Sequence, residues 1–273
     1  MLLKSLGLRV YITDAEGTPL PEYQEKQTKE DSIECWVPSI EGANFQIHWE
    51  ITDSVSATTG CDSCAIPYFD GVRLKGKIAS SGKNTGRLYG YPVGPTTIRL
   101  YQFEKRQFTD EEDTILTNEI STEDIGTIRL KVVWGQEVQK RRAPYYCNNT
   151  DPTPGPIHEK MAKKGCWDAA RLGPITDATG RQQTFCKFIK NKEIVPGNFL
   201  FRYAAKDVLE AQGIIPPTAK PALPTEVNPQ VKMELFATNF SRKRGRSSSL
   251  EDTKGIIAHT KRLKAGDIMK SQV

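Results

Sequence analysis

The sequence predicts a mostly β fold: an antiparallel β-sandwich or barrel-like domain with one or two short helices, followed by a disordered tail. Three observations predict it. Several short segments alternate apolar and polar residues, which is the period of a strand. Gly, Pro and Asn residues separate these segments at the spacing of turns. Beyond Gly213 the chain becomes rich in proline and then in basic residues, with no sustained apolar pattern.

The first half of the chain holds the clearest strand signals. Residues 9–13 alternate and end at a turn, and residues 44–51 alternate over most of their length. In the second segment one face carries Phe45, Ile47, Trp49 and Ile51, and the other carries Gln46, His48 and Glu50. One apolar face is typical of an antiparallel sheet that covers a core on one side. We also expect Trp36, Trp49 and Trp134 in the core, because aromatic side chains on strands bury large areas.

The strongest hairpin signal joins residues 64–69 to residues 72–78. Asp70-Gly71 between them suits the positive φ angles of a tight type I′ turn. Further strands are predicted at residues 97–103, 126–134, 184–189 and 199–203. Strands at this spacing favour a sandwich or barrel over a parallel α/β sheet.

The alternation is lost over about residues 135–181, which we interpret as an irregular insertion in the domain. One helix, weakened by Gly165, is predicted over 157–171. A second short helix is predicted over 204–212, with Gly213 as its stop. The predicted β-rich domain therefore spans residues 1–213.

Residues 214–230 contain five prolines and are predicted to form an extended linker. Residues 231–273 are predicted to be a disordered basic tail. The last 33 residues, 241–273, hold nine Lys or Arg and three Asp or Glu, out of 38 and 33 in the chain, which leaves 29 basic and 30 acidic residues in 1–240. Because the basic character belongs to the tail, the composition of the domain gives no reason to expect a nucleic-acid footprint on it.

Several phrases, in order and at specific spacing, resemble a family of uncharacterised fungal, basidiomycete-type proteins defined only by a domain of unknown function. The resemblance covers roughly residues 5–216. Its phrases are Leu20-Pro21-Glu22-Tyr23, Cys35-Trp36-Val37-Pro38-Ser39 with Gly42, Phe45-Gln46-Ile47-His48-Trp49, Tyr68-Phe69-Asp70-Gly71-Val72, Ile125-Gly126-Thr127-Ile128, and Phe201-Arg202-Tyr203 through Leu209 to Pro216. The sequence departs from the pattern at 204–206, where a more proline-like helix entry is expected. The resemblance implies a β-rich domain and a variable tail, and it implies no activity.

Cys61 and Cys64 form a C-x-x-C pair, which is half of a zinc site or a redox pair. Zinc needs two more ligands, and only the distant Cys147, His158 and Cys166 offer them. A redox pair normally lies at a helix start, whereas this pair precedes a strand. We therefore expect reduced thiols and no cofactor, with a zinc-stabilised domain as an alternative.

No catalytic constellation is visible. His48 lies on the polar side of a strand, and nothing in the spacing of His48, His158 and His259 proposes a base beside a nucleophile. The glycines of 80–94 do not form a phosphate-binding motif, since no helix follows them. Lys83 and Arg87 in that stretch are candidate contacts for a polyanion.

The tail carries two basic clusters about a dozen residues apart, as in a bipartite nuclear-import signal. The first consists of Arg242, Lys243, Arg244 and Arg246, and the second of Lys261, Arg262 and Lys264. Ser247, Ser248 and Ser249 follow the first cluster. Arg244 and Arg246 lie three residues before Ser247 and Ser249, a spacing that suits a basic-directed kinase. Phosphate there would oppose the basic charge. The alternatives are a solvated basic tail that has no specific binding partner and a tail that makes generic contacts with polyanions.

These patterns lead to one functional hypothesis. We expect a non-catalytic protein-interaction domain whose tail binds an import receptor, and hence a nuclear protein, with a cytoplasmic location as the alternative. No secretory signal opens the chain and no apolar run is long enough to cross a bilayer, so we expect neither secretion nor a membrane partner. A nucleic-acid or chromatin-associated factor and an enzyme of unrecognised type are the rival functions.

Overall fold

The computed structural model describes residues 1–52, 60–94, 96–110, 121–141, 152, 155–159, 167–178 and 185–216. The chain divides into two compact units, Met1–Thr218 and Ala219–Val273. All described residues belong to the first unit. The predicted linker beyond residue 216 and the basic tail lie outside them.

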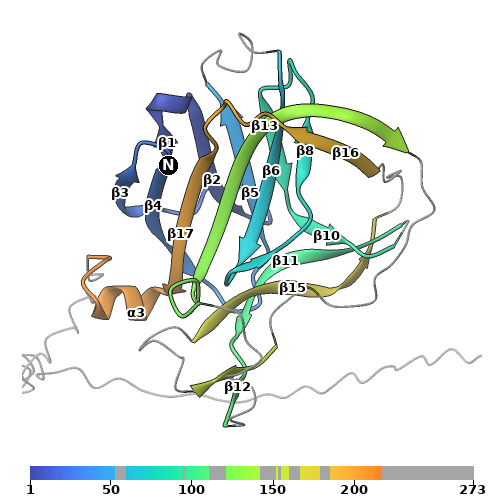
Figure 1. Ribbon diagram of the computed structural model, residues 1–273. Helices are drawn as coiled ribbons and strands as arrows, with labels where there is room; N and C mark the ends of the chain where they lie inside the picture. The colour runs from blue at the N-terminus through green and yellow to red at the C-terminus, as the bar shows by residue number, and fades with distance from the viewer. Residues whose placement is uncertain are drawn as a thin grey trace, which may run out of the picture. The chain divides into compact units, whose positions relative to one another are not determined.

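The largest sheet has eight strands and lies at the front of Figure 1. Its path is β3 (Tyr23–Lys29), β4 (Ser32–Ser39), β17 (Gly197–Ala205), β13 (Thr127–Arg141), β6 (Asp62–Phe69) and β7 (Val72–Arg73), with β16 (Phe185–Lys190) paired to β13 and β8 (Lys77–Ala79) paired to β6. Its pairs are antiparallel except β4 with β17, which run parallel over Ser32–Ser39.

A four-stranded sheet packs behind the large one. It orders β1 (Leu2–Leu3), β2 (Leu8–Asp14), β5 (Phe45–Ile51) and β9 (Thr85–Leu88), and a short 3₁₀ helix (Lys4–Leu6) joins its first two strands. Two smaller sheets complete the fold: β10 (Gly90–Pro92), β11 (Thr97–Lys105) and β15 (Asp168–Asp177) form one, and β12 (Phe108–Thr109) pairs in parallel with β14 (Ile157–His158). The helix α3 (Lys206–Ala211) follows β17. The mostly β fold is confirmed, and in the described residues the sheets stay open.

One core fills the space between the sheets, because their inward faces contribute to a single apolar cluster. Phe45 packs against Phe69 of the large sheet and Phe103 of the β11 sheet, with ring centroids 5.5 and 4.5 Å away. The predicted inward face of 45–51 is confirmed, and Trp49 and Trp134 are fully buried. Trp36 is only half-buried, and it packs with Leu209 and Ile215 in a small second cluster beneath α3.

The predicted tight turn at Asp70-Gly71 is confirmed, since both residues have positive φ angles, 47° and 87°. The strand after it is shorter than the predicted 72–78. It stops at Arg73, and the chain pairs again with β6 as β8.

The helix predicted over 157–171 is wrong at both of its described ends, while residues 160–166 lie outside the described residues. The described parts of 135–181 are also less irregular than the sequence indicates. β13 continues to Arg141, and strands β14 and β15 occupy Ile157–His158 and Asp168–Asp177. β15 is a strand because β11 offers it an antiparallel partner over its whole length, and Ala169, Ala170 and Leu172 are buried there. The pairing with a distant strand outweighs the weak helical pattern.

The second predicted helix is confirmed in type but begins later, at Lys206, because β17 runs through Ala205. Gly213 has a φ of 70° and ends the helical turn as predicted. Among the described helices, none has the length and apolar character needed to cross a membrane.

Candidate functional site

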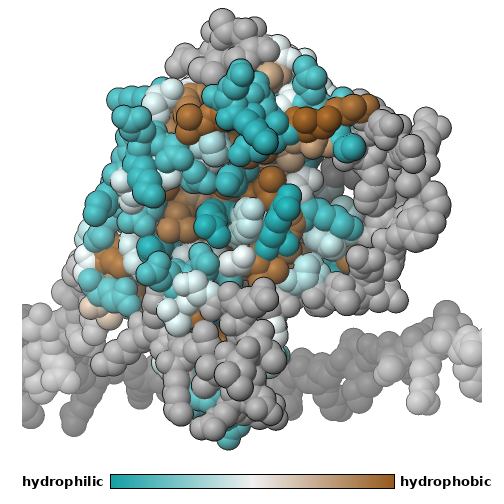
Figure 2. Space-filling model, in the orientation of Figure 1, coloured by the Kyte–Doolittle hydropathy of each residue, from teal (hydrophilic) through white to brown (hydrophobic). Residues whose placement is uncertain are grey.

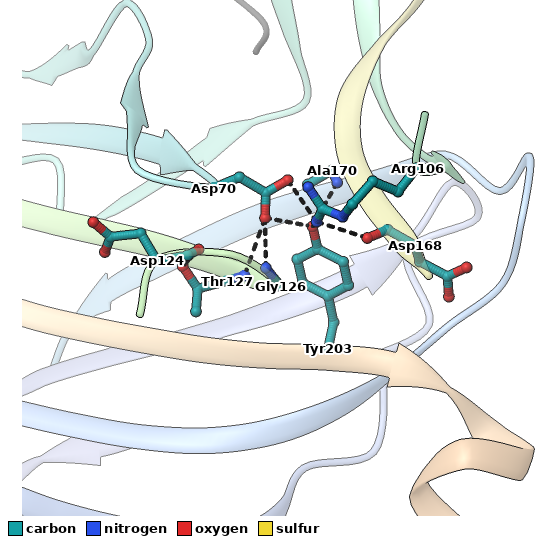
Figure 3. Close-up of polar contacts among 8 residues, drawn as sticks. All are labelled: Asp70, Arg106, Asp124, Gly126, Thr127, Asp168, Ala170 and Tyr203. Atoms are coloured by element: carbon teal, nitrogen blue, oxygen red, sulfur yellow. Dashed lines mark hydrogen bonds and ion pairs between the residues drawn. The ribbon is translucent and has the colours of Figure 1, made fainter. Parts of the chain in front are cut away.

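A buried polar centre forms where the turn after β6 and the strands β13 and β17 of the large sheet meet the β11–β15 sheet (Figure 3). Asp70 supplies its carboxylate. The tight turn places this side chain inward, and its backbone N–H donates to Thr127 O at 2.9 Å, which fixes the turn against β13. Asp70 is only 1% exposed. A carboxylate at such a site costs stability unless hydrogen bonds replace its water.

Four donors converge on that carboxylate. Oδ1 accepts from Gly126 N at 2.8 Å, Tyr203 OH at 2.9 Å and Thr127 N at 3.3 Å. Oδ2 accepts from Arg106 Nη2 at 3.0 Å. Burial raises the pKa of Asp70, while Arg106, Tyr203 and Gly126 act to lower it. The donors come from β17, from the start of β13 and from the chain after β11, so one side chain ties together segments far apart in sequence.

Arg106 and Tyr203 extend the centre toward β15. Arg106 Nη2 also donates to Asp168 O at 2.8 Å. The Tyr203 hydroxyl accepts from Ala170 N at 2.7 Å and from Arg106 Nη2 at 3.4 Å while it donates to Asp70. Burial, and then the nearby Asp70 charge, raise the pKa of Tyr203. The phenol therefore stays protonated and keeps its donor role.

The centre is closed to solvent, since Arg106 and Tyr203 are nearly as buried as Asp70. An ion pair at such depth is a weak source of net stability, but it fixes geometry because a displaced partner would leave a buried charge uncompensated. We therefore interpret Asp70, Arg106 and Tyr203 as the element that holds the sheets in one arrangement.

Two exposed apolar residues lie next to segments that these buried contacts join. The Ser39 hydroxyl donates to Asp168 Oδ2, which joins the end of β4 to the start of β15. Ile40 follows Ser39 and is 66% exposed, and Trp167 precedes Asp168 and is 56% exposed. Both therefore stand directly next to backbone that the buried contacts hold in place.

Trp167 forms an aromatic pair with Phe108, and the two rings meet edge to face with centroids 5.6 Å apart. Arg106 N donates to Trp167 O at 2.8 Å, and Phe108 lies two residues after Arg106. β12 is further held by β14, because Ile157 N donates to Gln107 O and the Ile157 side chain is buried. We name Phe108 and Trp167 the aromatic pair.

The predicted thiols Cys61 and Cys64 are both buried, and burial raises the pKa of Cys64 to about 11. Such a thiol is a poor nucleophile and a poor metal ligand at neutral pH. His158, a distant candidate ligand, is buried in β14, while Cys147 and Cys166 lie outside the described residues. In the part of the chain that the structure describes, no three His, Cys, Asp or Glu side chains are grouped for a metal ion.

The remaining predicted sites fall in different places. His48 lies on the outer face of β5, stacked on Tyr11, as expected for the polar side of that strand. Lys83 and Arg87 are both exposed. The import-signal residues Arg242 to Lys264 and the serines Ser247–Ser249 lie outside the described residues.

The buried centre is not visible in the sequence. Asp70 was predicted only as a turn residue, and its partners Arg106 and Tyr203 are 36 and 133 positions away. Nothing local marks Arg106 as buried, because it stands in the polar run 104–107 between Phe103 and Phe108.

Comparison with known families gives one match. Residues 7–218 match a family model described as "Domain of unknown function (DUF7918)". The match confirms the resemblance to a domain of unknown function over almost the predicted range, and the fungal origin stays a prediction. No curated protein and no solved structure matches the chain.

Proposed function

We propose that this chain, which belongs to the DUF7918 family, is a non-catalytic nuclear protein. Its β domain binds a protein partner through the aromatic pair, and its basic tail binds an import receptor. The observation that carries the first part is Trp167, an indole 56% exposed beside a backbone that buried hydrogen bonds fix.

The physical case for the aromatic pair rests on its size and its support. Trp is enriched among the residues that dominate binding energy at protein interfaces, because its large rigid ring loses little entropy on binding. Trp167 and Phe108 already contact each other, and the buried centre fixes the segments that carry them. Less conformational freedom is then lost when a partner docks.

A structural role for the buried centre supports the non-catalytic part of the proposal. A general acid or base must reach a substrate proton. The carboxylate of Asp70 instead faces two backbone amides, a phenol and a guanidinium, and all of its partners lie inside the protein.

The import part rests on the two basic clusters of the tail. Extended Lys and Arg side chains at that separation suit two acidic pockets on one receptor. Phosphorylation at Ser247–Ser249 would add about −1.5 to −2 charge per site and weaken this contact. The tail would then regulate where the protein resides without altering the β domain.

The partner-binding role is tested with the full chain as bait in quantitative affinity capture. Trp167→Ala should lower the yield of the partner that the wild-type chain captures by about 30-fold, as expected for the loss of an interface Trp. The matched control is Val138→Ser with Ile189→Ser, since these apolar residues are 48% and 52% exposed on the β13–β16 ribbon. Figure 2 shows several hydrophobic areas on the drawn face, one of them at the upper right. Equal capture by Trp167→Ala and wild type would refute the role of the aromatic pair.

The import role is tested with a fluorescent fusion of the full chain. Changing Arg242, Lys243, Arg244 and Arg246 to Ala should redistribute the fusion to the cytoplasm. Replacing Ser247–Ser249 with Asp should also move the fusion toward the cytoplasm, but to a smaller extent. A fusion that stays nuclear with both basic clusters neutralised would contradict the proposed import signal.

A further inference from the structure

One residue, Arg106, holds the backbone that carries Trp167. Its main-chain N–H donates to Trp167 O at 2.8 Å, and its guanidinium Nη2 donates to Asp168 O at 2.8 Å. Two consecutive carbonyl groups at the start of β15 are therefore bonded to the same residue. We name these two hydrogen bonds the Arg106 clamp.

The side-chain half of the clamp depends on the buried centre (Figure 3). The same Nη2 atom lies 3.0 Å from Asp70 Oδ2 and 3.4 Å from the Tyr203 hydroxyl. Both charged side chains are buried. A guanidinium at this depth needs a carboxylate beside it, because an unpaired buried charge is strongly unfavourable. Asp70 therefore keeps the Arg106 side chain in the place from which it reaches Asp168 O.

The supports of Trp167 itself come from one short segment, 106–108. In the part of the chain that the structure describes, its hydrogen-bond partner is Arg106 N, and its ring partner is Phe108, with centroids 5.6 Å apart. Phe108 lies two residues after Arg106. A shift of Arg106 would therefore disturb both contacts of Trp167 at once.

We propose that Arg106 is a positioning residue of the aromatic pair, whose guanidinium, held by Asp70, sets the orientation of the Trp167 indole at the surface. This inference rests on the proposed role of Trp167 in partner binding and adds the residue that prepares it. An indole already held in one orientation loses less conformational freedom when a partner docks. The ion pair thus acts on the interface although both of its charges lie inside the protein.

A purely structural role of Arg106 leads to a different expectation. Its removal would then act through stability alone, and a variant that regains stability would also regain the order of Trp167. A positioning role instead follows the presence of the guanidinium. Arg106→Met and the double variant Asp70→Asn with Arg106→Met separate the two, because both lack the guanidinium but only the single variant leaves a buried carboxylate unpaired.

The test labels the four tryptophans of the full chain with 5-fluorotryptophan and records ¹⁹F NMR spectra. Trp167→Phe assigns the Trp167 signal by its loss. In Arg106→Met and in the double variant, this signal should move at least halfway toward that of free 5-fluorotryptophan, while the signals of the buried Trp49 and Trp134 stay in place. An unchanged Trp167 signal, or one that recovers in the more stable double variant, would overturn the proposal.

The matched control is Gly86→Ala, which destabilises the protein at a different sheet. A Cβ at Gly86 would lie 1.9 Å from Cζ2 of Trp49, so this variant should move the Trp49 signal and leave that of Trp167 in place. Equal movement of the Trp167 signal in Gly86→Ala and in Arg106→Met would show that it reports stability, and the positioning role would fail.

Affinity capture with the same variants separates this inference from the proposed function. Arg106→Met should lower the yield of the partner about fivefold, less than Trp167→Ala does, because the ring remains and only its order is lost. Full capture by Arg106→Met beside a large loss in Trp167→Ala would overturn the positioning role and leave the aromatic pair as the binding surface. Full capture by Trp167→Ala would instead refute the proposed function, while the ¹⁹F spectra still decide whether the clamp orients the indole.

Discussion

Asp70→Asn isolates the charge of the buried centre. Asn has nearly the same volume as Asp, and it is among the residues that tolerate the positive φ of 47° at this position. Its Oδ1 still accepts from Gly126, Thr127 and Tyr203, so three of the four hydrogen bonds survive. What is lost is the negative charge 3.0 Å from Arg106 Nη2, where an amide N–H₂ would now face a cation.

The magnitude follows from the burial of that pair, whose side chains are both 2% exposed. Removing one member of a buried ion pair costs about 3–5 kcal/mol, because the other charge stays desolvated. With an m-value of about 2 kcal/mol/M, Asp70→Asn should lower the urea midpoint by about 2 M. Such a loss is a large share of the ~5–15 kcal/mol by which proteins of this kind are stable.

Urea unfolding of the full chain, followed by Trp fluorescence, measures this loss. The control is Arg202→Met, which breaks the Arg202–Glu34 pair at 3.3 Å on the half-exposed surface and should cost less than about 1 kcal/mol. The double variant Asp70→Asn with Arg106→Met should lose less than the sum of the single losses, since neither charge is left alone. A loss under about 1 kcal/mol for Asp70→Asn, or full additivity in the double variant, would refute the role assigned to the centre.

Two further outcomes follow from the four-stranded sheet. Gly86→Ala should destabilise the protein by about 1–3 kcal/mol in urea unfolding, because a Cβ there would lie 1.9 Å from Cζ2 of the buried Trp49; an unchanged midpoint would mean that Trp49 moves aside freely. Burial, and then the Arg87 charge, lower the pKa of His48 in the folded protein. The stability that neutral His48 contributes is therefore present above the pKa of the unfolded chain, about 6.5, and is lost as the pH falls below it. Between pH 7 and pH 5 the free energy of unfolding of His48→Gln should therefore fall less than that of the wild type. Equal falls in both proteins would show that His48 does not cause this pH dependence.

Local patterns account for what the sequence predicts correctly. The alternation at Phe45–Ile51 identifies the buried face of β5 because the period of two is a property of the strand itself. The turn at Asp70-Gly71 follows in the same way from the φ preferences of its two residues. Neither inference needs knowledge of a distant partner.

The errors and omissions have the opposite origin. The first residues of β15, 168–171, were predicted as helix because its partner β11 lies about seventy residues earlier, and no pattern within 157–171 reveals that pairing. The same holds for the buried centre, since the large sheet and the β11–β15 sheet must meet before Asp70, Arg106 and Tyr203 become neighbours. Trp36 shows a smaller error of this type: an aromatic on a strand was expected in the core, whereas the outer face of β4 is only half covered by α3 and the residues after it.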